Sequence, residues 1–345
     1  MPKTIKVCLM GFGNVNQAFV HLITRKKALL EEQYDLQLLV SAIASARHGH
    51  AIDPDGIDLE KALKLYQSSS SLNSLSSSHA PKNVHDFIAQ SGAEILVEAT
   101  PVNYETGEPA ISHIRAALEA GLHAVSANKG PVAHAYHDLR ELANRQGRQF
   151  LFESTVMDGA PIFSLVRETL PAAEIRGFEG ILNSCTNLII ERMEDGESFE
   201  SAVEYAQSIG IAETEPSGDI DGWDAAIKVA ALITVLMNEP FTPQQVAREG
   251  IRDLSATEVQ QAMREGNRWK LVCRAERETG ILTASVGPEL VEAKSPLFSV
   301  NGTSSIIVFN TDVLPGLAIQ ESDPGPETTA YGLLADILNI VKAGG

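Results

Sequence analysis

The sequence predicts an α/β protein in which a doubly wound parallel sheet is followed by a second domain of α+β character. Three observations support this prediction. Strand-like and helix-like segments alternate over the first ~150 of the 345 residues, as is typical of parallel sheets. A glycine-rich turn, GFGNVN (11–16), joins the first strand to the first helix. Beyond residue ~155 the alternation stops, and helices are followed by strands of antiparallel character.

The elements of the first domain follow from their apolar patterns. Leu36–Ala44 is continuously apolar, as expected for a strand whose sheet is covered on both faces. The serine-rich stretch 68–79 is expected to be a solvated loop. The other strands are expected at Ile5–Met10, Glu94–Ala99, His123–Ser126 and Phe150–Glu153, and the helices at Val15–Leu30, His113–Ala120 and Ala135–Arg145.

The second domain centres on a strongly apolar helix. Residues 229–237, which follow Lys228, are apolar nearly all the way round, and such a helix is usually buried. Strands are expected at Gly177–Leu182, 281–290 and 304–311, and further helices at Ala160–Thr169, Thr186–Met193, Phe199–Ile209 and Glu327–Ile340.

Composition and charge argue against several classes of protein. The net charge of −18 disfavours nucleic acid as a partner. No apolar run reaches about 18 residues, which argues against a membrane span. The three cysteines, Cys8, Cys185 and Cys273, show no metal-binding or redox spacing. Together with a start that lacks a signal-peptide pattern, they favour a reduced, cytoplasmic setting.

The turn 11–16 matches the Rossmann dinucleotide-binding pattern G-x-G-x-x-G, except that Asn16 replaces the third glycine. The first glycine makes a tight turn, and the second lets the backbone approach a pyrophosphate that the helix N-terminus holds. The third serves only helix–strand packing, so the asparagine weakens the match modestly. The cofactor-binding residues expected in this turn are Gly11, Phe12, Gly13, Asn14 and Val15.

The end of the second strand bears on the choice of cofactor. An NAD site usually places an acidic residue there for the ribose 2′-hydroxyl, and AIASARHGH (42–50) has none. Arg47 can pair with a 2′-phosphate instead, so NADP is favoured and NAD stays possible. Two further strand ends, in EATPVN (98–103) and SANKGP (126–131), put Thr100 and Lys129 at the sheet edge where ligands bind.

Several carboxylates precede the apolar helix, in AETEPSGDIDGWDAAIK (212–228). Asp224 and Lys228 share a helix face at i,i+4, and an unpaired buried charge is costly, so this face is expected to line a cavity. A lysine in a cleft beside a carboxylate can act as a general acid or base. The pattern suits a small zwitterionic substrate whose ammonium group the other carboxylates hold.

A different mechanism would use Cys185. The stretch NSCTN (183–187) resembles the cysteine-centred stretch of phosphorylating aldehyde dehydrogenases, in which the cysteine is a nucleophile. Those enzymes activate the thiol with a histidine later in the chain. All nine histidines here lie at or before His137, so that mechanism lacks its base and is disfavoured.

Taken together, GFGNV, SANKGP, ESTVMDGAPI (153–162), NSCTNLI and the segment 212–228 resemble the homoserine dehydrogenases. FNTDVLPGLAI and PGPETTA (324–330) extend the resemblance over nearly the whole chain, which stops soon after Ile340 as in the short form without a C-terminal regulatory domain. The resemblance implies NAD(P)-dependent interconversion of L-aspartate 4-semialdehyde and L-homoserine, in threonine, methionine and isoleucine biosynthesis. It also implies a homodimer with a dinucleotide-binding domain (1–150 and 311–345) and a substrate-binding and dimerisation domain (151–310).

The resemblance also implies residue roles. Lys129 and Lys228 match the two lysines at the reacting oxygen, with Lys228 as the proton donor. Glu213 matches the glutamate that binds the substrate amino group. The remaining implied roles are substrate binding for Asp219, Asp224 and Thr186, cofactor contact for Gly325, and sodium binding for Glu153, Val156, Asp158 and Ala160.

Two stretches depart from the family pattern. Ser184 and Cys185 stand where a Gly-Thr pair is common, and Asp158 and Ala160 stand where small residues and glycine are common. These departures bear on the metal site and on the choice of substrate. The alternatives are a related NADP-dependent dehydrogenase of another short hydroxy acid and a non-catalytic NADP-sensing protein.

Overall fold

A computed structural model describes residues 2–343 and confirms the α/β fold class. The chain forms two compact units, one of Met1–Pro161 with Gly325–Gly345 and one of Ile162–Pro324. The sequence had put these boundaries at 150 and 310. Strand β12 (Pro315–Glu321) pairs with β11 (Ser305–Thr311), and this pairing keeps residues up to 324 in the second unit.

The first unit contains a six-stranded sheet in the order β3-β2-β1-β4-β5-β6. Neighbouring strands are parallel except for β2 and β3, which form an antiparallel hairpin at one edge. Its strands are β1 (Lys3–Met10), β2 (Leu36–Ser45), β3 (Gly49–Ile52), β4 (Ile95–Glu98), β5 (His123–Ser126) and β6 (Phe150–Leu151).

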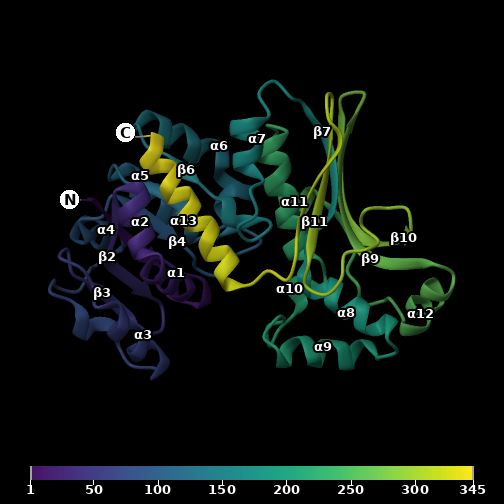
Figure 1. Cartoon of the computed structure of the whole chain (residues 1–345), viewed down its shortest axis with the longest axis horizontal. Helices are drawn as coiled ribbons and strands as arrows, with labels where there is room; N and C mark the ends of the chain where they lie inside the picture. The colour runs from purple at the N-terminus through teal and green to yellow at the C-terminus, as the bar shows by residue number, and fades with distance from the viewer. Residues whose placement is uncertain (1, 344–345) are drawn as a thin grey trace. The chain divides into compact units, whose positions relative to one another are not determined.

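The last helix of the chain, α13 (Pro326–Ala343), packs against α1 (Asn14–Arg25) in this first unit (Figure 1). A Cβ atom at Gly332 would lie 2.4 Å from Oγ of Ser154, so only a glycine at this position lets α13 lie this close to Ser154. The other helical segments are α2 (Lys27–Tyr34), α3 (Leu59–Gln67), η1 (Leu72–Leu75), α4 (Val84–Ser91), α5 (Ala110–Glu119), α6 (Lys129–Arg145) and η2 (Glu153–Thr155).

The serine-rich stretch 68–79 differs from the solvated loop that was expected. Leu72 is fully buried, and the backbone N–H of Ser77 donates to the carbonyl of Ile52 in β3. The side chain of Asn73 accepts from the N–H of His50 at 3.0 Å. The sequence did not predict these contacts, because their partners lie about 25 residues earlier in the chain, beyond the range of a local pattern.

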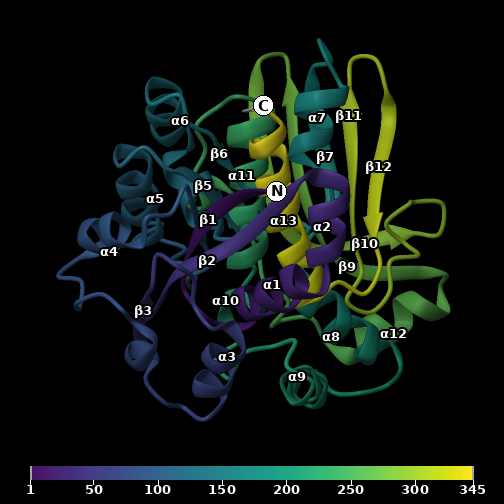
Figure 2. The same cartoon turned by 60° about the vertical axis from the view of Figure 1, so that its left-hand side comes forward.

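The second unit contains a six-stranded sheet in the order β12-β11-β7-β9-β10-β8, and Figure 2 shows β11 and β12 side by side at its edge. Neighbouring strands are antiparallel except for β8 and β10. The remaining strands are β7 (Ile175–Ile181), β8 (Ala247–Arg248), β9 (Asn267–Glu278) and β10 (Ile281–Glu292).

Helix α11 (Trp223–Leu236) is the buried helix that the apolar run predicted, and it packs against β9 and β10. Residues 225–227 and 229–233 are all at 0 % exposure. The other helical segments of this unit are α7 (Phe163–Thr169), α8 (Ser184–Glu194), α9 (Phe199–Ser208), α10 (Ser217–Ile220), η3 (Pro243–Gln245) and α12 (Ala256–Arg264).

Candidate active site

The glycine-rich turn has the geometry of a phosphate-binding turn. Gly11 has φ +86°, and a Cβ atom there would lie 2.7 Å from the carbonyl oxygen of Ala99, so a side chain is excluded. A Cβ at Gly13 would meet nothing within 4 Å, which leaves open space beside the turn. Gly13 is the N-cap of α1 and no side chain caps this end. The first N–H groups of α1 are therefore suited to hold an anionic group, and Asn14 and Val15 begin that helix.

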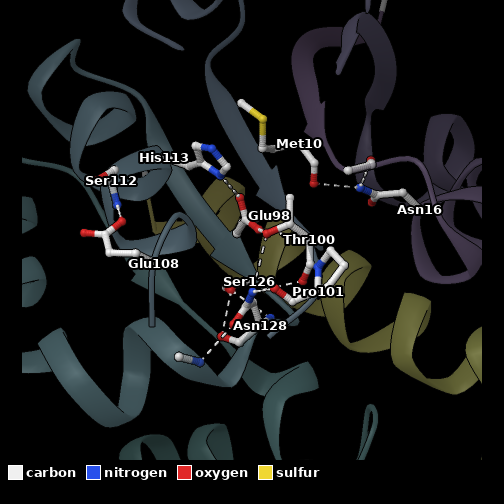
Figure 3. Close-up of polar contacts among 12 residues, drawn as sticks. Met10, Asn16, Glu98, Thr100, Pro101, Glu108, Ser112, His113, Ser126 and Asn128 are labelled. Carbon is white, nitrogen blue, oxygen red and sulfur yellow. Dashed lines mark hydrogen bonds and ion pairs between the residues drawn. The ribbon is translucent and has the colours of Figure 1, made fainter. Parts of the chain in front are cut away.

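Asn16, which replaces the third glycine of the pattern, supports the turn from behind. It is fully buried, and its Nδ2 donates to the carbonyl of Gly11 at 2.7 Å and to that of Met10 at 3.4 Å (Figure 3). The asparagine thus replaces the packing role of the third glycine with hydrogen bonds to the turn itself.

Arg47 lies in the turn between β2 and β3 and is exposed. The neighbouring His48 is held in place, since its Nδ1 lies 3.2 Å from the carbonyl oxygen of Ser70 and its ring lies 4.3 Å from that of Tyr66. Tyr66 also contacts Phe12 of the glycine-rich turn, edge to face at 5.6 Å. Because Phe12 is only 2 % exposed, it acts here as a packing residue that connects the two loops.

The ends of β4 and β5 carry Thr100 and Lys129. Lys129 is the half-buried first residue of α6, and Asn128 caps that helix by accepting from the N–H of Gly130 at 2.9 Å. The hydroxyl of Thr100 donates to the carboxylate of Glu98, so that hydroxyl is engaged within the protein. Any cofactor contact by Thr100 would then use its other atoms.

Gly325 directly precedes α13. Its carbonyl oxygen accepts from the N–H groups of Thr328 and Thr329, as at a helix N-terminus, and a Cβ at Gly325 would meet nothing within 4 Å. The expected cofactor-contacting glycine thus lies beside open space, at the positive end of a long helix.

The expected sodium site is not supported. Val156 and Ala160 offer only backbone oxygens, and the carboxylate of Asp158 accepts a hydrogen bond from the hydroxyl of Thr329 at 2.5 Å. Glu153 is buried, and its N–H donates to Asp336 at 2.8 Å. Within residues 2–343, no three His, Cys, Asp or Glu side chains are grouped so that they could hold a metal ion.

The second unit brings Asp219, Asp224 and Lys228 together. The Nζ of Lys228 lies 3.1 Å from Oδ2 of Asp224 and donates to the carbonyl of Leu182 at 2.6 Å. The side-chain amide of Asn183 donates to Asp219 at 2.7 Å and to Asp224 at 3.0 Å, so it links the two carboxylates. The side chains of Lys228 and Asp224 are 14 % and 11 % exposed. A lysine held in this way is fixed in position by a largely buried frame.

Asn183 is the residue of this cluster that the sequence reasoning missed. It is the N-cap of α8, and its Oδ1 accepts from the N–H of Thr186 at 2.8 Å. An asparagine between a strand and a helix is a signal for helix capping. That signal could have located Asn183, but not its second role at two carboxylates that follow 36 and 41 residues later.

Of the two other expected substrate residues, Thr186 is bonded to Asn183 and Glu213 stands apart from this frame. Thr186 is fully buried, and its hydroxyl donates to the Oδ1 of Asn183 at 2.9 Å, so a direct substrate contact would need this bond to change. Glu213 lies between α9 and α10 with an exposed side chain, and its carbonyl accepts from Gln207 at 3.1 Å. Both assignments stay predictions.

Cys185 is unsuited to nucleophilic catalysis. Burial, together with the negative charges of Asp219 and Asp224, raises the pKa of its thiol well above the usual range. The attacking form of a cysteine is the thiolate, which this surrounding disfavours. The structure thus adds a second argument against the cysteine mechanism, beside the missing histidine.

A dinucleotide-binding turn in one unit and a lysine–carboxylate frame in the other define the class of protein, an NAD(P)-dependent oxidoreductase. Residues 11–153 match the family model for the homoserine dehydrogenase NAD-binding domain, and residues 161–338 match that for homoserine dehydrogenase. The chain belongs to the homoserine dehydrogenase family.

Individual relatives agree with this assignment. A homoserine dehydrogenase of Methanocaldococcus jannaschii is 35 % identical, with 98 % of both chains covered. An NAD(+)-dependent homoserine dehydrogenase of Pseudomonas canavaninivorans is 34 % identical, with 97 % of this chain and 96 % of that protein covered. A crystal structure of a putative homoserine dehydrogenase from Archaeoglobus fulgidus superposes with a TM-score of 0.85 at 27 % identity, covering 98 % of this chain and 99 % of that one.

A further solved structure bears on the cofactor. A hyperthermophilic archaeal homoserine dehydrogenase in complex with NADPH superposes with a TM-score of 0.83 at 28 % identity, with 99 % of this chain and 98 % of that chain covered. Nicotinamide dinucleotides are therefore the cofactor class of this family. Among the described residues, no helix combines the length and the apolar character that a membrane crossing requires.

Proposed function

We propose that this chain interconverts L-aspartate 4-semialdehyde and L-homoserine, with Lys228 as the acid–base group and Lys129 as a second cation at the reacting oxygen. When bound, the nicotinamide supplies or accepts the hydride. In the reducing direction, the ammonium of Lys228 gives a proton to the oxygen of the former aldehyde. We infer that the positive charges of these two lysines stabilise the negative charge that develops on that oxygen in the transition state.

The observation that carries this proposal is the frame around Lys228. Asp224 and the carbonyl of Leu182 both hold the Nζ atom of Lys228, at 3.1 and 2.6 Å. The side chain is therefore already fixed in one position, and the reaction does not have to supply the entropy cost of fixing it. Asn183 in turn fixes Asp224. A solvated surface lysine would need no such frame, because exposed ion pairs contribute little to stability.

Substitution of Lys228 tests the assignment. We expect Lys228→Ala to lower kcat for homoserine oxidation by about 10²- to 10⁴-fold, as is usual when a general acid or base is lost. Lys294→Ala is the matched control, because this lysine of the same unit has an 85 % exposed side chain. NADP binding, measured by titration, should be unchanged in both variants. Turnover of Lys228→Ala within about tenfold of wild type would contradict the role.

We propose further that NADP is preferred over NAD. The support comes from the end of β2 and the following turn, where Ser45, Ala46 and Arg47 offer an exposed guanidinium and no carboxylate. Arg47 pairs well with a phosphate and poorly with a hydroxyl. We expect Arg47→Ala to raise the KM for NADP by about tenfold and to leave that for NAD nearly unchanged, since a charge-assisted pair contributes roughly 1–3 kcal/mol. Equal changes for both cofactors would exclude this role.

We propose a homodimer in the cytoplasm. The second unit exposes large apolar side chains, among them Ile281 at 67 % and Val313 at 60 %, and we infer that a second copy of this chain covers them. The three cysteines are unpaired and buried, as in proteins of a reducing compartment. Light scattering after size-exclusion chromatography tests the dimer, and a monomeric mass at micromolar concentration would refute it.

A further inference from the structure

A buried carboxylate lies at the end of β4, beside the proposed cofactor site. Glu98 is fully buried, and burying a charge is costly unless hydrogen bonds compensate it. Its Oε1 accepts from the N–H of Thr100 at 2.8 Å and from the hydroxyl of the same residue. Its Oε2 lies 2.9 Å from Nδ1 of His113, which is on α5 and is half-buried (Figure 3). Two of these donors belong to the turn that follows the strand, so the carboxylate fixes that turn.

A second side chain holds the same turn from the next strand. Nδ2 of Asn128 donates to the carbonyl of Thr100 at 2.9 Å and to that of Pro101 at 3.3 Å. Asn128 is itself fixed by Ser126, whose hydroxyl accepts from its N–H at 3.0 Å and donates to its carbonyl at 3.1 Å (Figure 3). Ser126 and Asn128 are buried and Thr100 is half-buried, whereas Pro101 is exposed. The ends of β4 and β5 are therefore tied together by side chains.

This network extends to the start of α6. Asn128 caps the helix, and Lys129 is its first residue. A Cβ at Gly130 would lie 2.7 Å from Cα of Gly107, so the helix start packs directly on the backbone of the preceding loop. With backbone this close, a movement of the turn at Thr100 would be transmitted to the position of Lys129.

We propose that His113 and Glu98 are positioning residues for the dehydrogenase reaction. The imidazole N–H of His113 holds the Glu98 carboxylate, the carboxylate holds the turn at Thr100, and Asn128 passes this position on to Lys129. In this proposal both residues act through the turn at Thr100 and through Lys129, not on the reacting atoms themselves. This role rests on the proposed function, because Glu98 and His113 would hold the turn at Thr100 and, through it, Lys129.

Three substitutions test the proposal. His113→Leu removes the N–H donor at similar volume, and His113→Asn keeps an N–H where Nδ1 stands. His85→Leu is the matched control, since His85 is exposed on α4 of the same unit. We measure the Kd of NADPH by its fluorescence, then kcat and the KM for homoserine, and the midpoint of thermal unfolding. Cofactor binding does not require turnover, so it tests the positioning even if homoserine proves to be the wrong substrate.

For His113→Leu we expect the Kd of NADPH to rise and kcat to fall by about tenfold each, because small misplacements of binding groups have effects of this size or larger. The KM for homoserine should stay within about twofold, since the proposed amino-group contacts belong to the other unit. A lower kcat with an unchanged KM shows that substrate binding itself is not lost. His113→Asn should recover to within about threefold of wild type, and His85→Leu should match wild type.

A His113→Leu variant that melts earlier but keeps the wild-type Kd and kcat would refute the proposal, since its role would then be structural only. Failure of His113→Asn to recover either value would also refute it. If His113→Leu does not fold, His113→Gln replaces it, because its amide nitrogen corresponds to Nε2 and not to Nδ1. The same changes in Kd and kcat are then required.

Discussion

Lys270 gives a prediction about stability that can be worked out from the structure. It lies on β9 with 0 % exposure, and its Nζ donates to Oδ1 of Asn187 at 2.8 Å and to the carbonyl of Val300 at 2.6 Å. Burial, helped by the positive charge of Arg268, lowers the pKa of this lysine from the ordinary 10.5 to about 8. The charged form is therefore less stable in the folded protein than in the unfolded chain.

The sign of the pH effect follows from proton binding. Between about pH 8 and 10.5 the unfolded chain binds more protons at this site than the folded protein, so stability rises with pH in that window. At about 1.4 kcal/mol per pH unit, the full difference is roughly 3 kcal/mol. From pH 7 to pH 9.5 the expected gain is about 2 kcal/mol, because by then the folded state has lost nearly all of the proton and the unfolded state little of it.

Lys270→Met removes the titration at similar volume. We expect the difference in unfolding free energy between wild type and variant to move by about 2 kcal/mol in favour of wild type from pH 7 to pH 9.5. Both tryptophans, Trp223 and Trp269, belong to the second unit, so urea unfolding followed by tryptophan fluorescence reports on the unit that contains Lys270. Lys294→Met is the control, because this lysine belongs to the same unit and its side chain is 85 % exposed. A difference that stays constant over this pH range would refute the reasoning.

Two further predictions concern the frame around Lys228. Asn183→Leu removes the amide that links Asp219 to Asp224, so we expect kcat/KM for homoserine to fall by about ten- to a hundredfold. A change below twofold would show that the link is dispensable. Cys185→Ser should keep kcat within about threefold, and Cys185 should react slowly with iodoacetamide at pH 8 in the folded protein, because its raised thiol pKa leaves little thiolate. Loss of activity by more than a hundredfold would reinstate the cysteine mechanism.

Local sequence determined much of the first unit. The glycine turn and the continuously apolar strands gave the parallel sheet, since both depend on the backbone conformation and burial of a few neighbouring residues. The buried helix α11 followed in the same way from its uniform apolar run. The short strand β3 was missed, because its order comes from antiparallel pairing with β2 and from hydrogen bonds to the stretch 68–79. Helix α3 was missed although Asp58 caps its start, which is a local helix signal.

For the candidate site too, local sequence pattern predicted some residues, and only the tertiary structure identified others. Residue type and spacing indicated Lys228 and Asp224, because i,i+4 neighbours on a helix must meet. In the structure Asp224 pairs with that lysine and also accepts a hydrogen bond from Asn183, while its contact with a substrate stays a prediction. Asn183 could not be assigned to this frame from the sequence, because its partners follow more than 35 residues later.

The Glu98–His113 pair shows why tertiary structure was needed. In the sequence, Glu98 is the last residue of an apolar strand and His113 one of nine histidines. Only the packing of α5 beside the end of β4 brings Nδ1 within 2.9 Å of the carboxylate. The sequence by itself determined which segments fold and which chemical groups the chain offers, since both depend on local pattern. The tertiary structure decided which of those groups are buried together, because burial is what makes a polar group require a partner.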